Sequence, residues 1–168
     1  MEADHADDTL SQLKHIPFEY AVYASIDDLP PADAALLRDA LSATALSYAP
    51  YSNFHVGAAA RMASGAIIRG ANQENASYPV GICAERTLLS VAATLHPGEP
   101  IDTLAVTAAE SPDPVRPCGL CRQSLYEFQT RTAHPLRLIM GGASGPVWVL
   151  EDARALLPLA FTSEDLRP

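Results

Sequence analysis

The residues best suited to chemistry in this chain are three cysteines. Cys118 and Cys121 form a Pro-Cys-x-x-Cys motif, and Cys83 opens a separate Cys-Ala-Glu-Arg segment. Each motif falls where we expect a helix to begin, and the positive end of a helix favours the thiolate form that binds metals. Structural zinc sites almost always have four protein ligands, whereas catalytic zinc sites keep one position for water. Three cysteines therefore fit a catalytic zinc site with one open position.

The cysteines could also serve a different purpose, and the motifs alone leave this open. A lone Cys-x-x-Cys can be two small core residues or a redox pair, although a redox pair usually follows an early strand and this one lies late in the chain. A structural zinc site would need a fourth ligand. The candidates are five histidines without paired spacing: His5, His15, His55, His96 and His134.

Glu85 favours the catalytic alternative. It lies two residues after Cys83 in the same expected helix, which would place its carboxylate beside the open metal position. There it could take a proton from the activated water and deliver it to a leaving group. An acidic residue in a first helical turn can also simply complement the helix dipole. Its coincidence with three cysteines of zinc-binding type favours the proton-transfer role.

Alternating strands and helices must position these side chains. The patterns of apolar residues, turns and caps predict one domain, an α/β sandwich with a mixed sheet. The expected strands cover residues 16–25, 55–62, 66–71, 101–109, 136–140 and 147–150, and the expected helices cover residues 31–47, 83–96, 118–129 and 151–156.

Composition and charge narrow the class of protein. The 168 residues are 48% hydrophobic and carry a net charge of −9, which disfavours a nucleic-acid-binding surface because phosphates attract clustered Lys and Arg. Nine of the twenty acids lie in residues 1–39. The acidic start is unlike a secretory signal, and the longest uncharged stretch, residues 40–60, is too polar to span a membrane. We expect a cytoplasmic protein with reduced thiols.

Four consecutive segments resemble the cytidine deaminase family, specifically its small zinc-dependent nucleoside deaminases with three cysteines. Together they extend over roughly residues 36–168. The four are APYSNFHVGA at residues 49–58, NQENASYPVGICAERT at 72–87, PCGLCRQ at 117–123 and LLPLAF at 156–161. They resemble, in order, the substrate loop, the ribose-binding and first zinc segment, the second zinc segment and the C-terminal segment of the family.

The resemblance implies a three-layer α/β/α sandwich that binds one Zn²⁺ per chain through Cys83, Cys118 and Cys121. Glu85 would then shuttle protons in the hydrolytic deamination of cytidine and 2′-deoxycytidine to uridine and 2′-deoxyuridine, a reaction of pyrimidine salvage. Zinc with three thiolates sums to a charge of −1. Our hypothesis is that Arg86 hydrogen-bonds a thiolate and partly offsets that charge.

The resemblance also implies how a pyrimidine nucleoside is held. Phe54 would pack on the base, the Ala84 backbone would help to hold it, and Asn72 and Glu74 would bind the ribose hydroxyls. Members of the family are usually homotetramers. Tyr78 and Phe161 are the side chains we expect to contribute to the site of a neighbouring subunit.

Two segments depart from the family pattern. Residues 1–30 form an acidic arm outside the expected deaminase domain at residues 31–168, and this arm could pack on the body or add a strand. The loop at residues 111–116 is rich in proline and places Arg116 beside the second zinc segment. The departures leave two alternatives open, a deaminase of a modified or N4-substituted cytidine or a nucleoside antibiotic, and a non-catalytic zinc module.

Overall fold

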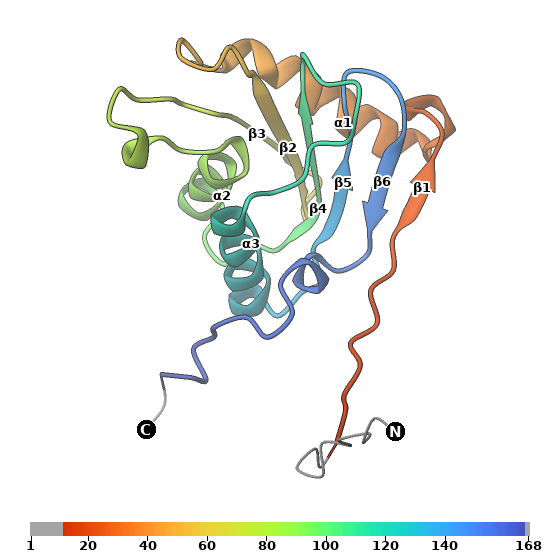
Figure 1. Cartoon of the computed structure of the whole chain (residues 1–168), viewed down its shortest axis with the longest axis vertical. Coiled ribbons are helices and arrows are strands. Elements are labelled where there is room, and N and C mark those ends of the chain that lie inside the picture. The colour runs from red at the N-terminus through yellow and green to blue at the C-terminus, as the bar shows by residue number, and fades with distance from the viewer. Residues whose placement is uncertain (1–11, 167–168) are drawn as a thin grey trace, which may run out of the picture.

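The computed structural model describes residues 12–166, so the first eleven residues of the expected arm, with His5, lie outside the described residues. A six-stranded sheet with the order β1-β6-β5-β4-β2-β3 forms the centre of the molecule (Figure 1). β4 and β5 are parallel, and the other neighbours are antiparallel. The elements are β1 (Ala21–Tyr23), α1 (Pro31–Ala43), β2 (Val56–Met62), β3 (Ile67–Ala71), α2 (Ala84–Leu95), β4 (Ile101–Ala108), α3 (Gly119–Thr132), β5 (Arg137–Met140) and β6 (Val147–Leu150), with short 3-10 turns at Ile26–Asp28, Thr44–Leu46, Tyr78–Val80 and Ala153–Leu156.

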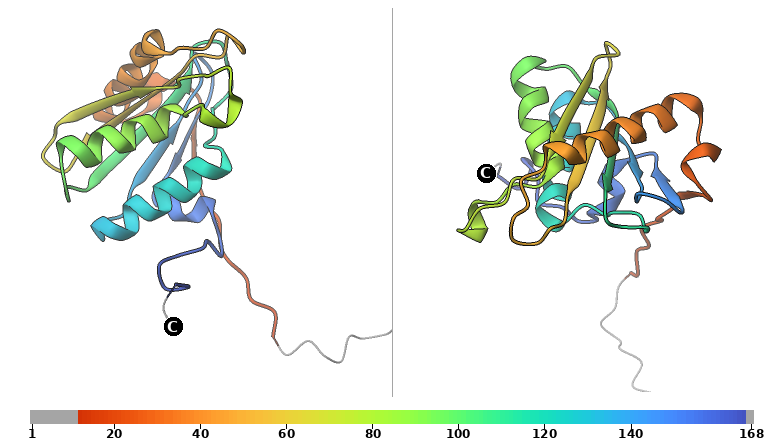
Figure 2. Two further views of the ribbon diagram at one scale, coloured as in Figure 1. Left: turned by 90° about the vertical axis from the view of Figure 1, so that its left-hand side faces the viewer. Right: turned by 90° about the horizontal axis from the view of Figure 1, so that it is seen from above.

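Helices cover both faces of the sheet, with α1 on one face and α2 and α3 on the other (Figure 2). The two faces follow from the alternation of side chains along the strands. Ala59 and Ala105 pack with α1, whereas Ala58 and Val106 pack with α2 and α3. This confirms the predicted α/β sandwich with a mixed sheet and three layers.

Several element boundaries differ from the sequence prediction. The first helix ends at Ala43 rather than near residue 47, and the chain tightens into a 3-10 turn in which the Thr44 hydroxyl donates to the Leu41 carbonyl. The third helix continues to Thr132 and ends where Ala133 adopts a left-handed conformation with φ of 51°. The segment at 153–156 is a 3-10 turn, with the side chain of Asp152 capping its start.

β1 pairs with the edge of β6 over three residues only. Before β1 the chain runs in an extended path away from the sheet (Figure 1). The Tyr20 ring packs on Trp148 with a centroid separation of 5.1 Å, and Phe18 packs on Tyr20. Within residues 12–166, no helix combines the length and apolar character needed to cross a membrane.

Gly70 allows α2 to lie directly on β3. A Cβ at this position would come within 2.7 Å of both the Ala84 carbonyl oxygen and the Leu88 amide nitrogen. These are backbone atoms of the first two turns of α2, which cannot move away as a flexible side chain could. The glycine therefore fixes the distance between the sheet and the helix that begins next to Cys83.

We expect Gly70→Ala to lower the free energy of unfolding by about 1–3 kcal/mol, because the added methyl overpacks this contact. Gly119→Ala is the matched control, since nothing lies within 4 Å of a Cβ built there. Urea unfolding of the two variants measures the difference. Equal stability of the two proteins would contradict the tight contact between α2 and β3.

Candidate active site

The three cysteines meet where α2 and α3 begin. Cys83 and Cys118 are the residues that cap the N-termini of α2 and α3, and Cys121 lies buried one turn into α3. The two helices lie side by side on one face of the sheet (Figure 2). This arrangement explains how residues 35 positions apart in the sequence come together at one end of the molecule.

The spacing of the sulfurs fits a tetrahedral zinc ion. The Sγ atoms of Cys83 and Cys118 are 3.8 Å apart, those of Cys118 and Cys121 are 3.5 Å apart, and all three lie within 4.8 Å of one another. A zinc–sulfur distance of about 2.3 Å gives a tetrahedron whose edges are about 3.8 Å. The cluster can therefore hold one zinc ion as three of its four ligands.

The thiols share their protons unequally before a metal binds. Hydrogen bonds from Cys121 and Cys118, assisted by the charge of Arg86 and opposed by burial, lower the pKa of Cys83 to about 6. The same coupling to Cys83, together with burial, raises the pKa of Cys121. Ionisation is thus favoured at Cys83 and disfavoured at Cys121, and a bound cation would favour the thiolate form of both.

Glu85 is buried beside this cluster in the first turn of α2, with 3% of its surface exposed. Burial raises the pKa of its carboxyl, and the nearby negative charge of Cys83 raises the pKa further. A carboxyl group whose pKa is raised toward neutrality can both accept and donate a proton in one reaction cycle. A glutamate that merely complemented the helix dipole would have no reason to be buried.

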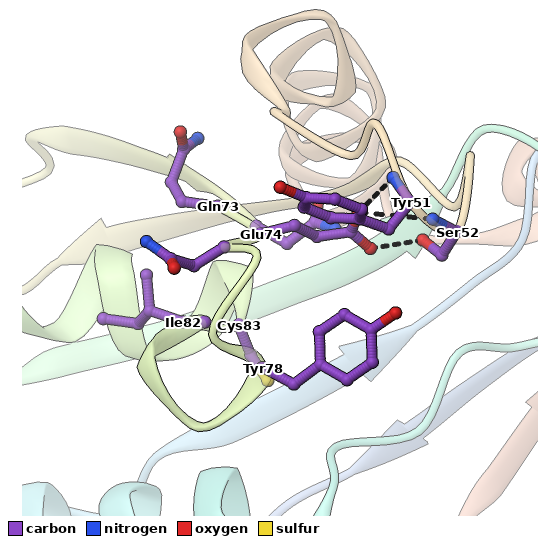
Figure 3. Close-up of a pocket in the computed structure, with 10 residues that line it drawn as sticks. Tyr51, Ser52, Gln73, Glu74, Tyr78, Ile82 and Cys83 are labelled. Carbon is purple, nitrogen blue, oxygen red and sulfur yellow. Dashed lines mark hydrogen bonds between the residues drawn. The ribbon is translucent and has the colours of Figure 1, made fainter.

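A cavity of about 450 Å³ adjoins Cys83. The rings of Tyr51 and Tyr78, both in the lining, face each other (Figure 3) in an edge-to-face arrangement with centroids 6.0 Å apart. The lining contains four residues selected from the sequence, Asn72, Glu74, Tyr78 and Cys83, and six others, Tyr51, Ser52, Gln73, Asn75, Gly81 and Ile82.

Glu74 is fixed in this cavity by the loop before β2. Its carboxylate accepts the backbone N–H groups of Tyr51 and Ser52, at 2.9 and 3.3 Å, and the Ser52 hydroxyl (Figure 3). The hydrogen bond from Ser52 is the main cause that lowers the pKa of Glu74, so this exposed side chain is ionised at neutral pH. Ser52 is a site residue that the sequence did not predict, because nothing in the local pattern links it to a residue 22 positions away.

Asn72 has a structural task in addition to any ligand contact. Its amide nitrogen donates to the Phe54 carbonyl at 2.9 Å, and its amide oxygen accepts from the Val56 N–H at 2.9 Å and from the Ser47 hydroxyl at 2.5 Å. A primary amide has two N–H donors, and in residues 12–166 only one of them has a partner. The direction of the second N–H group is fixed, because these hydrogen bonds hold the Asn72 side chain in place.

Phe54, Ala84 and Phe161 are not among the residues that line this cavity. Phe54 precedes β2 with 40% of its surface exposed, and Ala84 is fully buried as the first residue of α2. Tyr78 and Phe161 are 76% and 61% exposed. The tail that carries Phe161 is tied to α3, because the Gln123 amide donates to the Phe161 carbonyl at 2.9 Å.

Arg86 lies next to Glu85 on α2. Among the described residues no hydrogen bond joins its guanidinium to a cysteine sulfur, but its charge lowers the pKa of Cys83 and opposes the rise in the pKa of Glu85. Arg122 instead holds the second motif, donating to the Pro117 carbonyl at 2.9 Å and to the Leu156 carbonyl at 3.3 Å.

We expect Cys118→Ser and Cys121→Ser each to remove most of the bound zinc, because a hydroxyl is a far poorer zinc ligand than a thiolate. Elemental analysis of the purified proteins measures the zinc per chain. Ser124→Ala is the control, since this α3 hydroxyl donates to the Leu120 carbonyl and is not part of the cysteine cluster. Full zinc retention by either cysteine variant would contradict the three-cysteine site.

Comparisons with known proteins agree with this geometry. The model of the cytidine and deoxycytidylate deaminase zinc-binding region matches residues 30–134. A cytidine deaminase from Halalkalibacterium halodurans is 40% identical over 132 residues, covering 78% of this chain and 95% of that protein. The crystal structure of cytidine deaminase from Burkholderia pseudomallei has a TM-score of 0.68 and 41% identity over 76% of this chain and 97% of that one. The corresponding structure from Mycobacterium leprae has a TM-score of 0.60 and 36% identity over 74% and 95% of the two chains. The chain therefore belongs to the zinc-dependent cytidine deaminase family.

Proposed function

We propose that this chain hydrolytically deaminates free cytidine and 2′-deoxycytidine to uridine and 2′-deoxyuridine, with release of ammonia. The observation that carries the proposal is a buried glutamate beside three cysteines whose sulfurs have the spacing of a tetrahedral zinc site. The relatives named cytidine deaminase, which match over nearly their full lengths, support the same reaction. A place in pyrimidine salvage follows from these substrates and products.

Cys83, Cys118 and Cys121 would hold the zinc ion, which would supply a Lewis acid able to make a water molecule acidic near neutral pH. Glu85 takes a proton from the attacking water and delivers it to N3 of the pyrimidine. After the water oxygen has added to C4, the same carboxylate takes the remaining proton from the new C4 hydroxyl and relays it to the exocyclic amine. The C4–N4 bond then breaks, the C4 carbonyl forms and ammonia leaves. Burial of Glu85 suits this double role because it raises the pKa of the carboxyl.

The remaining site residues orient the nucleoside. Phe54 packs on the flat pyrimidine ring, and the backbone of Ala84 holds the base above the start of α2. Asn72 and Glu74 bind the ribose hydroxyls as donor and acceptor. Both side chains are supported by the loop before β2, so the geometry of the ribose contacts depends on that loop.

Arg86 lies in the first turn of α2, three residues after Cys83. We propose that its positive charge, rather than a hydrogen bond to a thiolate, offsets the net −1 of zinc with three thiolates. The effect of Arg86 on the pKa of Cys83 supports this proposal. A weaker negative charge on the ligands preserves the pull of the metal on its water.

The assembly and the domain division are also proposals. The exposed aromatic side chains of Tyr78 and Phe161 support a homotetramer in which they reach the site of a neighbouring subunit. The family match to residues 30–134 supports a deaminase domain that begins at residue 31 and is preceded by an acidic arm. Because β5 and β6 belong to the same sheet, we extend this domain to residue 168. The free cysteines are compatible with a cytoplasmic location, where thiols stay reduced.

No contact among the described residues favours a modified base over cytidine. Arg116, the residue that departs from the family pattern, places its guanidinium over the Trp148 ring at 5.5 Å. It is not among the residues that line the 450 Å³ cavity next to Cys83. The unusual loop therefore gives no separate support to a second substrate class.

We expect Glu85→Gln to retain its zinc and to lose turnover of cytidine by about 10²–10⁴-fold, because the amide can no longer carry a proton. Ultraviolet absorbance follows the reaction, with cytidine, deoxycytidine, cytosine, cytidine monophosphate and an N4-substituted cytidine as substrates. Glu127→Gln, an exposed glutamate of α3, is the matched control. The enzyme proposal fails if the zinc-loaded parent protein deaminates none of these compounds.

We expect Glu74→Gln to shift selectivity from cytidine toward cytidine monophosphate. The ionised carboxylate accepts from ribose and repels a nearby phosphate, and the neutral amide does neither as strongly. The ratio of kcat/KM for the nucleotide to that for the nucleoside should rise about tenfold, which corresponds to the loss of one like-charge contact. An unchanged ratio would show that Glu74 does not face the 5′ end of the substrate.

A further inference from the structure

The start of β2 lacks complete neighbours on both sides. β2 lies between β3 and β4 (Figure 1), and the registered pairs at this end are Val56 with Ala108 and Gly57 with Ala71. Residues 54 and 55 therefore extend beyond the paired residues of both neighbouring strands, and Val56 extends beyond those of β3. Unpaired backbone N–H and C=O groups are costly wherever water is excluded.

Two side chains replace the missing strand contacts. On the β3 side, the Asn72 amide bridges the Phe54 carbonyl and the Val56 N–H. On the β4 side, the Glu110 carboxylate accepts the His55 N–H at 2.9 Å and pairs with the His55 imidazole. The Ala109 N–H donates to the His55 carbonyl at 3.1 Å. Residues 54–56 are thus held along both edges.

The contacts of Asn72 and Glu110 with residues 54–56 form a clamp, and this clamp fixes the direction of Phe54. Val56 and Ala58 pack toward α2 and α3, and in an extended chain the residue two positions earlier lies on the same side. Phe54 therefore lies on the side of the sheet where α2 and α3 bring their cysteines. Since Asn53 before it has a φ of +53°, the chain turns sharply at the point where the clamp begins.

The same glutamate also begins the loop that leads to the second zinc motif. Farther along this loop the Val115 N–H donates to the Gly141 carbonyl at 3.1 Å, two residues before Pro117. The contact between Glu110 and His55 consequently joins the segment with Phe54 to the segment that ends at Cys118.

Stability is a poor reason for this contact between the His55 and Glu110 side chains. The side chains of His55 and Glu110 are 36% and 42% exposed, and exposed ion pairs contribute little to the free energy of unfolding. The backbone N–H of His55 lowers the pKa of Glu110, so the carboxylate remains charged at neutral pH. The contact is better explained by its effect on the position of the backbone at His55.

We propose that Glu110, acting through His55, is a positioning residue that sets the place of Phe54 against the pyrimidine ring. This inference rests on the proposed deamination of cytidine and adds to it a residue outside the cavity lining. Because Glu110 acts on the wall that packs against the base, its loss weakens substrate binding more than it slows proton transfer by Glu85.

The chain offers a matched control at the opposite end of β4. Glu99 also accepts a backbone N–H, from Ser64 at 2.7 Å, and also pairs with a histidine, His96 at 2.9 Å. It lies before β4, whereas Glu110 lies after it. Glu99→Ala therefore removes the same kind of contact from the same sheet without touching residues 54–56.

The experiment compares steady-state kinetics, zinc content and thermal unfolding of Glu110→Ala, Glu110→Gln and Glu99→Ala with those of the parent enzyme. We expect Glu110→Ala to raise KM for cytidine about tenfold while kcat stays within about threefold and zinc is retained. Glu110→Gln, which keeps an acceptor for the His55 N–H, should lie between Glu110→Ala and the parent. Glu99→Ala should leave KM unchanged.

A KM for Glu110→Ala within about twofold of the parent value, or an equal rise in Glu99→Ala, overturns the inference. If Glu110→Ala does not fold, the KM of Glu110→Gln decides in the same way. Failure of the proposed function is a separate result, because it appears as absence of cytidine turnover in the parent enzyme. Loss of thermal stability without a change in KM would assign Glu110 a merely structural role.

Discussion

Negative charge concentrated where two helices begin is the constraint on which the site depends. Three thiols and a buried carboxyl lie together at the start of α2 and α3. Burial, and then the nearby charge of Cys83, raises the pKa of Glu85, and the hydrogen bond with Cys83 together with burial raises the pKa of Cys121. The positive helix ends offset part of this charge, and a divalent cation offsets more. The packing of α2 on Gly70 and the pairing of the strands serve to keep these two helix ends adjacent.

Local spacing singled out three cysteines, which the structure brings together, and Glu85, which is buried beside them, because each motif lies within one helical turn. The motifs alone did not decide between a catalytic zinc site and its alternatives, and the family resemblance implied the ligand set. The alternation of apolar residues likewise predicted the sheet and its two covered faces. Contacts between distant segments could not be predicted from local sequence patterns. The bonds of Ser52 to Glu74 and of His55 to Glu110 span 22 and 55 positions. The ends of helices also escaped prediction where tertiary contacts set them, as after Ala43, where a 3-10 turn follows directly.

Several polar residues have two tasks in this molecule. Asn72 and Glu74 complete the backbone hydrogen bonding of the loop before β2 and also face the cavity. A side chain that is already bonded on one side loses little conformational freedom when a ligand arrives, so such sites are preorganised. Replacing Asn72 or Glu74 therefore changes the loop and the ligand contact together.

β1 is the strand at one edge of the sheet, where β6 would otherwise be the edge strand. With three residues it shields the backbone of Val147, Trp148 and Val149 in β6. Those three apolar residues would otherwise form a bare edge, the kind of surface on which strands of other chains add and aggregates grow. With β1 in place, the strand at this edge of the sheet has only three residues, and very short edge strands are poor templates for pairing with another chain.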